Sequence, residues 1–425
     1  MRKRRNCRSF LWKKYGGKGV NVLNQKEELR SRILQEILPG EQISDDDLYA
    51  RIDRCMDKHF ANDFIRLEKR RKLRREIFNS IRKLDVIQEL LDDDEVTEIM
   101  VNGPDEIFIE KEGRIFKSPL QFENQERLDN IAQQIASAGN RIVNETNPIL
   151  DARLEDGSRV NIVVPPIAIE GPVITIRKFP KEIMTMEKLV QLGSITREAE
   201  VFLRKMVQAK YNIFISGGTG AGKTTFLNVL SGFIPRWERV VTIEDSAELQ
   251  IQNIDNLVRL ESRNANVEGK NQITIRDLVK SALRMRPDRI IVGEIRDAAA
   301  IDLLQAMNTG HDGSLSTGHA NSPQDMLNRM ETLVLMGMDI PLAAVRQQIS
   351  SGIDLIIHLG RLRDRSRRVL QISEVGTVKD GKIQIIPLFV FREQGEKDGK
   401  VIGRLEKTQF DLQFTEKCLR AGVTI

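Results

Sequence analysis

Cysteine is scarce in this sequence, and long apolar segments are absent. The three cysteines, Cys7, Cys55 and Cys418, are odd in number and lie far apart in a chain of 425 residues. They form neither a disulfide framework nor a zinc-ligand pattern, which favours a protein of the reducing cytosol. No apolar run approaches the roughly 20 residues that a membrane-spanning helix needs, and no apolar core follows the basic N-terminus. We therefore expect a cytoplasmic protein without a transmembrane helix or a cleaved secretory signal.

Acidic residues are under-represented at the N-terminal end. Residues 1–82 contain 22 Lys and Arg against 12 Asp and Glu, about +10, so the remainder of this +5 chain carries about −5. Such an arm can meet an acidic lipid or protein surface, or it can be a solvated basic helix. Aromatic residues make up only 5% of the chain, too few to give this region stacking platforms for bases. We therefore expect no nucleic-acid partner.

Changes of pattern along the chain predict five segments. Residues 1–25 carry basic clusters without a period and are expected to be a disordered tail, whereas residues 26–82 repeat apolar residues at helical spacing and predict a basic helical module. Residues 83–180 mix hairpin and helix signals and predict an α+β domain, which a linker at 181–194 follows. In residues 195–425 helical and strand patterns alternate, which favours an α/β domain with a mostly parallel sheet, ending in a β-rich tail.

A complete phosphate-loop motif lies in the last segment. An apolar run at 213–215, short enough for a buried strand, leads to Gly217, four further residues, and Gly222, Lys223 and Thr224, and a helical pattern follows. Glycines let successive N–H groups curl around a polyphosphate, and the positive end of the helix faces the same anion. We expect Lys223 to contact the β- and γ-phosphates and Thr224 to bind Mg²⁺.

The spacing, the Lys-Thr ending and the flanking elements agree, so a glycine-rich turn without a ligand is the weaker interpretation. No Asn-Lys-x-Asp motif is present, which favours ATP over GTP. The expected cofactor is Mg²⁺ with ATP. The candidate ATP-binding residues are Gly217, Gly218, Thr219, Gly220, Ala221, Gly222, Lys223, Thr224 and Thr225.

Two apolar stretches downstream of the loop end in acidic residues. The stretch 240–243 leads to Glu244, and the stretch 290–292 leads through Gly293 to Glu294. In open α/β sheets functional groups gather at the carboxyl ends of strands. With Lys223, these two glutamates are therefore the catalytic candidates: one would orient or deprotonate the attacking water, and the other would support the hydrated metal. The sequence leaves open which glutamate has which role.

Histidines and arginines supply the remaining candidates. His311 and His319 lie close together, but no third ligand at metal-site spacing accompanies them. We interpret them as reporters of the phosphate state, with structural histidines as the alternative, and we expect His358 to be structural. Arg159 and Arg177 lie in β segments of the preceding domain. Arginine from across a domain or subunit boundary can stabilise a transferring phosphoryl group, although each can equally be an ordinary surface residue.

Four motifs occur in order along the chain, at residues 217–225, 242–249, 284–296 and 308–323. Together they resemble the type II/type IV secretion-system and pilus motor ATPase superfamily, and most of all its tight-adherence, CpaF-like branch. The resemblance covers about residues 84–390. It implies an α/β fold in which a RecA-like P-loop ATPase domain follows a smaller, PAS-like α+β domain and an N-terminal helical module.

The resemblance also implies an activity and partners. It implies an ATPase that works as a homo-hexamer at the inner face of the cell membrane, pushes on an inner-membrane platform protein, and powers a tight-adherence or type IV-like pilus or secretion. Glu244 matches the family's acidic box, Glu294 its modified Walker B motif, and His311 and His319 its histidine box. Arg159 and Arg177 match N-domain arginines that reach the nucleotide in relatives.

The four-cysteine zinc insertion that is typical of many type II secretion and pilus-extension ATPases is missing, which argues against those branches. Conjugative type IV secretion ATPases also lack it, so that branch stays open. A nucleic-acid translocase on the same core and a scaffold that does not hydrolyse ATP are the remaining alternatives.

Overall fold

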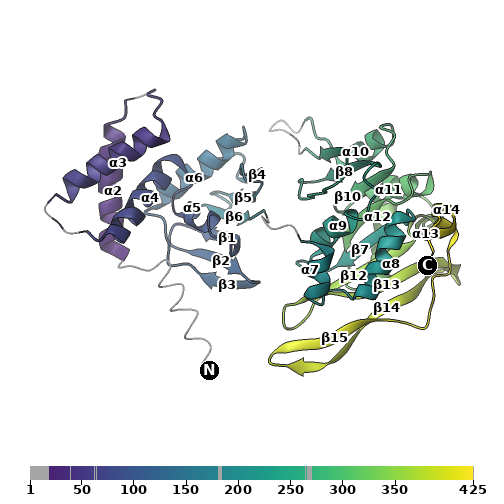
Figure 1. The fold of residues 1–425 in the computed structure, drawn as a ribbon. Coiled ribbons are helices and arrows are strands. Elements are labelled where there is room, and N and C mark those ends of the chain that lie inside the picture. The colour runs from purple at the N-terminus through teal and green to yellow at the C-terminus, as the bar shows by residue number, and fades with distance from the viewer. Residues whose placement is uncertain are drawn as a thin grey trace. The chain divides into compact units, whose positions relative to one another are not determined.

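The computed structural model describes residues 19–424 apart from residues 39, 62, 64, 180–183, 264 and 266–269. The chain forms two units, Met1–Lys181 and Glu182–Ile425 (Figure 1). Most of the expected N-terminal tail lies outside the described residues. Its last part, however, belongs to helix α2, which begins at residue 19 and not at the expected residue 26.

Three helices form the expected N-terminal helical module: α2 (Gly19–Gln35), α3 (Asp45–His59) and α4 (Leu67–Arg82). Ser44 caps α3 by accepting a hydrogen bond from the N–H of Asp47, as its position before three acidic residues predicts. The three helices pack around a small apolar cluster made up of Leu29, Ile33, Leu48, Ile52, Cys55, Met56, Leu73, Ile77 and Phe78.

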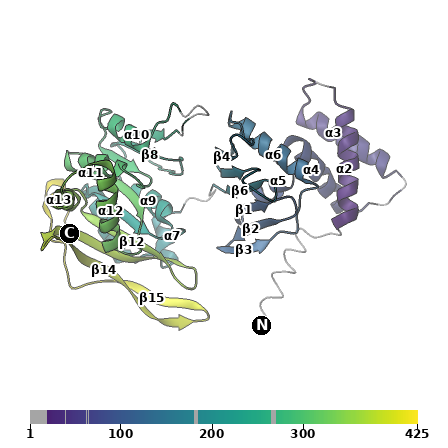
Figure 2. The same ribbon diagram turned by 180° about the vertical axis from the view of Figure 1, so that it is seen from behind.

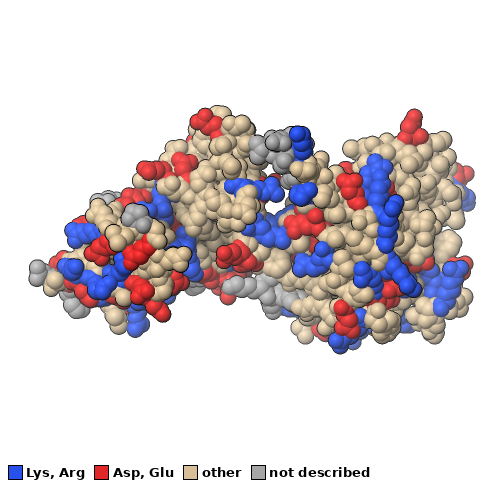
Figure 3. All heavy atoms as spheres, turned by 90° about the horizontal axis from the view of Figure 1, so that it is seen from above, with Lys and Arg blue, Asp and Glu red and all other residues tan. Residues whose placement is uncertain are grey.

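The charged surface of this module is mixed. Arg70 lies 2.6 Å from Asp57, and Arg74 lies 2.8 Å from Asp53, so acidic residues of α3 pair with basic residues of α4. Acidic and basic side chains alternate over this part of the molecule (left in Figure 3). For the described residues of the module, this distribution favours the solvated helix over a continuous basic patch.

The module and the following α+β segment belong to the same unit, and a buried carboxylate joins them. Asp85 accepts hydrogen bonds from Lys26 of α2 at 2.5 Å and from Arg127 of α6 (Gln125–Ala138) at 2.6 Å. Its side chain is 5% exposed. Burial by itself would raise the pKa of Asp85, but the two cations outweigh that effect and lower the pKa. Residues 26–82 and 83–180 are therefore packed together as one unit.

The rest of this unit is an antiparallel sheet in the strand order β3-β2-β1-β6-β5-β4. Helix α6 covers one face, on which residues such as Ile99, Ile174 and Ile176 are buried. The predicted hairpins and their alternation of buried and exposed residues are present. The elements are α5 (Val86–Leu91), β1 (Val96–Asn102), β2 (Ile107–Lys111), β3 (Arg114–Lys117), β4 (Ile149–Arg153), β5 (Arg159–Val163) and β6 (Val173–Arg177).

The second unit contains a nine-stranded sheet in the order β15-β14-β13-β12-β7-β11-β10-β8-β9. The strands from β12 to β9 run parallel, and β13, β14 and β15 extend the sheet in antiparallel fashion. The predicted, mostly parallel sheet is thus confirmed. The strands are β7 (Ile213–Gly217), β8 (Arg239–Glu244), β9 (Asn256–Glu261), β10 (Arg289–Val292), β11 (Leu315–His319), β12 (Leu355–Arg361), β13 (Arg367–Lys379), β14 (Lys382–Lys397) and β15 (Lys400–Lys407).

Helices cover both faces of this sheet (Figures 1 and 2). Helices α8 and α9 pack on one face with Ile213 and Ile215 of β7, and α10 to α13 pack on the other with Phe214. None of the described helices has the length and apolar character to span a membrane. The helices are α7 (Met186–Gln191), α8 (Arg197–Gln208), α9 (Lys223–Ser231), α10 (Ile275–Ala282), α11 (Ala299–Asn308), α12 (Pro323–Gly337), α13 (Leu342–Gly352) and α14 (Glu416–Ala421).

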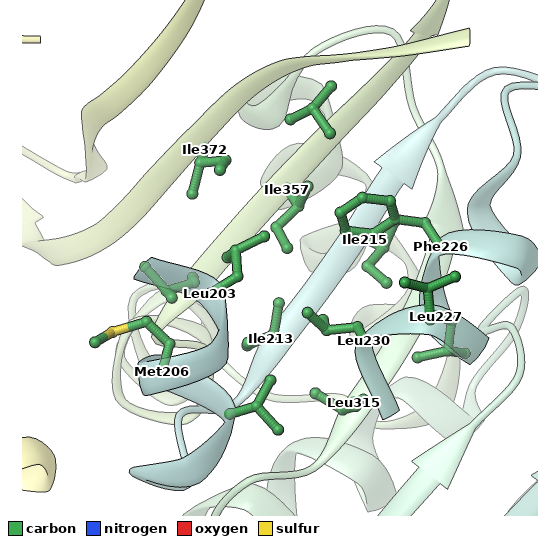
Figure 4. Packing of buried hydrophobic residues seen from close by; sticks show 14 of the residues in the cluster. Leu203, Met206, Ile213, Ile215, Phe226, Leu227, Leu230, Leu315, Ile357 and Ile372 are labelled. Atoms are coloured by element: carbon green, nitrogen blue, oxygen red, sulfur yellow. The ribbon is translucent and has the colours of Figure 1, made fainter. Parts of the chain in front are cut away.

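Strand β7 lies at the centre of this packing. All five of its residues are buried, because helices cover both of its faces and β11 and β12 pair with its two edges. Figure 4 shows Ile213 and Ile215 among side chains from α8, α9, β11 and β12. A strand buried in this way reads as a continuous apolar run, which is the pattern at residues 213–215.

Of the segment expected as a linker, 181–194, residues 181–183 lie outside the described residues, and residues 184–194 differ from that expectation. They contain helix α7, whose Met186 and Leu189 are buried in the apolar cluster of the second unit. Thr185 caps this helix by accepting a hydrogen bond from the N–H of Lys188. A flexible linker would make no such apolar contacts. The two buried side chains therefore attach this short helix to the second unit.

Replacing Asp85 by Asn should destabilise the first unit by about 3 kcal/mol, because two largely buried cations would lose their anion. The lowered pKa means that the carboxylate contributes its full stability above its ordinary pKa of about 4 and loses it as the pH falls through the folded-state value. Urea unfolding of the full chain, followed by circular dichroism at pH 7 and in acid, measures both effects. Asp57→Asn, at an exposed ion pair, is the control and should cost under about 1 kcal/mol. Equal losses in the two variants would contradict this account.

Candidate functional site

The parallel strands bring most of the predicted residues to one edge of the sheet. Gly217 at the end of β7 lies opposite His319 at the end of β11. Strand β10 pairs with both β11 and β8, so Glu244 at the end of β8 and Glu294 just beyond β10 reach the same edge. This is the carboxyl edge of the sheet, where open α/β folds bind their ligands.

The phosphate loop connects β7 to α9, whose first residue is Lys223. Gly220 and Gly222 have φ angles of 71° and 92°, which a residue with a Cβ seldom adopts. A Cβ on Gly217 would lie 2.5 Å from the carbonyl oxygen of Leu359 on the neighbouring strand. The sequence therefore needs glycine at these positions to bend the backbone into a loop at the N-terminus of a helix. Such a loop turns N–H groups toward an anion.

Lys223 is held inside the loop. Its side chain is 8% exposed, and its Nζ donates to the carbonyl oxygens of Gly217 at 3.1 Å and Gly218 at 3.0 Å. The same Nζ lies 3.3 Å from Nδ1 of His319. Because an ammonium group can only donate, Nδ1 accepts and the ring proton is on Nε2. The carbonyl oxygens are neutral acceptors, so an incoming phosphate would compete strongly for this cation.

A row of charged groups continues from Lys223 across the edge. Nε2 of His319 lies 3.1 Å from Oε1 of Glu294, and Oε2 of Glu294 accepts a 2.9 Å hydrogen bond from Nη2 of Arg296. Nη1 of Arg296 lies 3.9 Å from Oδ2 of Asp245. The phosphate-loop lysine is thereby linked through His319 to the acidic residue that follows β10.

Electrostatics set the protonation of this row. Burial alone would raise the pKa of Glu294, but the hydrogen bond and charge of Arg296, together with the charge of Lys223, lower it. Burial lowers the pKa of His319, and the charges of Lys223 and Arg296 add to this effect against the attraction of Glu294. At neutral pH, Glu294 is therefore ionised and the imidazole is neutral.

Glu244 has a different environment. It is 3% exposed, and its Oε2 accepts hydrogen bonds from the N–H groups of Glu248 at 2.6 Å and Leu249 at 2.9 Å. Burial raises its pKa in spite of these bonds. A Cβ at Gly293 would lie 3.1 Å from Cγ of Glu244, so glycine leaves room for this side chain. Two carboxyl groups whose surroundings shift their pKa values in opposite directions are suited to different chemical roles.

Glu244 also has an oxygen available for a ligand. Its Oε1 is buried and accepts no hydrogen bond from the described part of the chain, whereas the buried Oε1 of Glu294 has Nε2 of His319 beside it at 3.1 Å. A buried carboxylate oxygen without a donor is costly unless a water molecule, a metal ion or a substrate satisfies it. The donors of the loop and these oxygens together fit a hydrated Mg²⁺–polyphosphate.

Comparison with known proteins assigns a family to this arrangement. A family model described as "Type II/IV secretion system protein" matches residues 81–405. The chain belongs to this type II/IV secretion family. A putative conjugal transfer protein of Mycobacterium tuberculosis is 34% identical over 310 residues, covering 72% of this chain and 87% of the relative. The type IV secretion system protein VirB11 of Bartonella henselae is 31% identical over 322 residues, covering 67% and 89%.

A solved structure supports the fold. The X-ray structure of the Yersinia pseudotuberculosis ATPase DotB matches with a TM-score of 0.50 and 18% identity, covering 70% of this chain and 79% of that chain. The expected α/β architecture, with a RecA-like domain behind a smaller β domain and N-terminal helices, is thereby confirmed. These relatives do not separate the tight-adherence branch from the conjugative branch of the type II/IV secretion family.

The structure separates the two histidines of the family's histidine box. His319 ends β11 beside the phosphate loop, whereas His311 precedes β11 and lies at the amino edge of the sheet. A strand rises about 3.3 Å per residue, so the five residues of β11 alone keep the two histidines more than roughly 13 Å apart. The N–H of His311 donates to the carbonyl of Ala306, and Ser314 Oγ donates to the carbonyl of His311. Of the two histidines, only His319 therefore lies beside the phosphate loop of its own chain.

Arg159 and Arg177 lie in the first unit, on the sheet face opposite helix α6. They are direct cross-strand partners on β5 and β6, and Arg177 also lies opposite Glu98 of β1. Arg153 of β4 continues the row beside Arg159. Adjoining guanidinium groups on a rigid sheet are well suited to bind a phosphate.

The structure places two further residues near the loop. His358, expected to be structural, pairs with the phosphate-loop strand, and its Nδ1 lies 2.9 Å from Oγ of Ser216. Burial lowers its pKa. Arg367 of β13 donates from Nε to the carbonyl of Gly220 at 2.9 Å. This arginine lies 147 residues after Gly220 in a stretch whose pattern indicates only a β-strand, so no motif spacing points to it.

Gly217→Ala should destabilise the second unit by about 1–3 kcal/mol, because the new methyl group would overlap the backbone of Leu359. Gly218→Ala is a matched control, since nothing lies within 4 Å of the position of its Cβ. Thermal unfolding of the full chain should show a lower melting temperature for the first variant only. The same melting temperature for both variants would contradict this prediction, because it would show that the backbone of β12 can shift to make room for the methyl group.

Proposed function

We propose that this chain is an ATP hydrolase that binds Mg²⁺–ATP at the phosphate loop. The observation that carries the proposal is the position of Lys223. Its buried ammonium group lies inside a helix-capping loop and 3.3 Å from His319, at the edge where Glu244 and Glu294 meet. The solved structure that this fold matches is named as an ATPase, which supports the same proposal.

The loop residues 217–225 would hold the phosphates through backbone N–H groups and Lys223. Thr224, the second residue of α9, would offer its hydroxyl to Mg²⁺. The metal would neutralise phosphate charge and orient the terminal phosphoryl group. Once phosphate oxygens attract Lys223, its hydrogen bonds to the carbonyls of Gly217 and Gly218 would weaken. Its contact with Nδ1 of His319, and with it the influence of its charge on the pKa of His319, would change as well. His319 would thus report the state of the phosphate to Glu294.

The two glutamates receive different roles. Glu244, whose pKa burial raises, is the better proton acceptor and is proposed as the general base. Glu294 stays ionised beside Arg296 and would support the hydrated metal and position His319. The Arg159–Arg177 pair of the first unit is proposed to stabilise phosphoryl charge across a domain or subunit boundary.

The family supports a wider role. We propose that the chain assembles as a homo-hexamer on the inner face of the cell membrane, by peripheral association, and acts on an inner-membrane platform protein. The work would be assembly of a tight-adherence pilus or secretion. The names of the conjugal transfer and VirB11 relatives favour a conjugative type IV secretion ATPase equally. A nucleic-acid translocase would instead show hydrolysis stimulated by DNA or RNA, with binding that depends steeply on salt.

Lys223→Ala should abolish ATP hydrolysis by the purified full-length protein, because the loop loses its only side-chain charge. Lys205→Ala is the control, since Lys205 lies in the last turn of α8, next to the amino end of β7 and away from the loop. Phosphate release under saturating Mg²⁺–ATP measures both variants. Turnover that survives in Lys223→Ala, or is absent from the wild type, would refute the proposed activity.

Glu244→Gln and Glu294→Gln should separate chemistry from binding. We expect Glu244→Gln to bind ATP normally and to lose roughly 10²–10⁴-fold in kcat, as for a missing general base. Glu294→Gln should instead raise the KM for Mg²⁺–ATP. Because only the deprotonated form of Glu244 acts, its raised pKa predicts that wild-type kcat falls on acidification at a pH above the ordinary glutamate pKa of about 4.3. If Glu294→Gln lost kcat and Glu244→Gln raised the KM, Glu294 would be the general base and Glu244 would support the metal.

A further inference from the structure

The hairpin between β12 and β13 lies beside the phosphate loop. Strand β12 pairs with β7 as far as Leu359, which lies opposite Gly217, and then continues to Arg361. The chain turns and returns with Arg367 opposite Arg361. Residues 360–368, which we call the loop-side hairpin, therefore extend past the end of β7, where the phosphate loop begins.

Arg367 connects this hairpin to the apex of the loop. Its Nε donates to the carbonyl of Gly220, and its Cδ lies 3.3 Å from the position of a Cβ on Gly222. The apex itself is rich in glycine: Gly220 has a positive φ, and no atom outside the adjoining residues lies within 4 Å of the Cβ positions of Gly218 or Gly220. Glycine has the largest backbone entropy to lose, so an ordered apex benefits most from a fixed contact.

The tip of the loop-side hairpin is itself anchored. Arg363 pairs with Glu393 at 2.7 Å and with Glu396 at 2.8 Å, both on β14. Asp364 accepts hydrogen bonds at 2.9 Å from the N–H groups of Ser366 and Val401. Burial opposes ionisation of Asp364, but a 2.7 Å hydrogen bond from Oγ of Ser366, together with the two backbone bonds, prevails and lowers its pKa to about 2.

The base of the hairpin is anchored as well. Arg368 donates to the carbonyls of Leu192 and Gly193, and the N–H of Val369 donates to the carbonyl of Ser194. Arg367 therefore projects from a hairpin that is fixed at both its tip and its base. It can restrain the phosphate loop, because the hairpin itself does not move with the loop.

We propose that Arg367 is a positioning residue for the phosphate loop, and this rests on the proposed binding of ATP there. Without a nucleotide, Lys223 ties the loop together through the carbonyls of Gly217 and Gly218. A phosphate draws Lys223 away from those carbonyls, whereas the bond from Arg367 to Gly220 stays in place. It keeps the Gly220 carbonyl turned outward, and thereby keeps the loop N–H groups turned toward the phosphates.

The test is Arg367→Ala in the full-length protein. The KM for Mg²⁺–ATP should rise about tenfold, in line with the loss of one charge-assisted hydrogen bond, and kcat at saturating ATP should stay within about twofold. A fluorescent ADP analogue should dissociate faster by a similar factor. Arg367→Lys, which keeps the charge and a donor, should recover part of the affinity. Unchanged melting temperatures would show that the effect is local.

Two further arginines serve as controls. Arg404→Ala removes an exposed arginine of β15 in the same sheet and should leave KM and nucleotide release unchanged. Arg363→Ala breaks the anchor at the hairpin tip without touching the loop, and should raise KM by less than Arg367→Ala does.

The outcomes separate this inference from the proposed function. If the wild type hydrolyses ATP and Lys223→Ala does not, but Arg367→Ala behaves like Arg404→Ala, only the role of Arg367 is overturned. A fall in kcat without a rise in KM would also overturn it, as would an affinity loss that Arg367→Lys fails to reduce. A wild type that neither binds nor hydrolyses nucleotide would overturn both proposals together.

Discussion

The burial of β7 on both faces is the constraint on which the rest of the second unit depends. A strand covered by α8 and α9 on one side and by α10 to α13 on the other cannot shift or twist without exposing Ile213, Phe214 or Ile215. Its end at Gly217 is therefore a fixed point. The loop that follows, the helix that begins at Lys223, and the neighbouring strand ends are all placed relative to it.

Because the phosphate loop is fixed in place, the buried charge of Lys223 can be used to bind a phosphate. A cation is buried at Lys223, where it donates to two carbonyl oxygens and lies beside an imidazole that burial keeps neutral. The nearest carboxylate in the row, Glu294, is reached through that imidazole and is shared with Arg296. A polyphosphate offers Lys223 a far better partner than the carbonyls do. Its arrival can therefore rearrange the row from the loop to Glu294.

Much of this site is predictable because its chemistry is local in sequence. The strand, the glycines, Lys223 and the start of α9 lie in one short stretch, and their spacing alone predicts a phosphate loop. The acids at 244 and 294 follow apolar runs, and the ends of parallel strands meet at one edge, so their convergence was also predictable. The first-unit hairpins were predictable from turn residues and alternation. Helices α12, α13 and α14 and strand β9 were not predicted, because their apolar positions mix with polar ones and tertiary packing decides their state.

The histidines and arginines show where prediction from sequence ended. His311 and His319 are close in sequence, yet the strand between them carries them to opposite edges of the sheet. Arg367 is distant in sequence, yet antiparallel pairing returns it to the phosphate loop. In the sequence, Glu244 and Glu294 each follow an apolar stretch and cannot be told apart. In the structure, burial raises the pKa of Glu244, whereas Arg296 lowers that of Glu294. The sequence by itself determined the phosphate loop, the class of fold and the candidate acids, because these depend on local spacing and periodicity. Only the tertiary structure decided which distant side chains share the site and which carboxyl group stays charged, because both depend on strand pairing and exclusion of water.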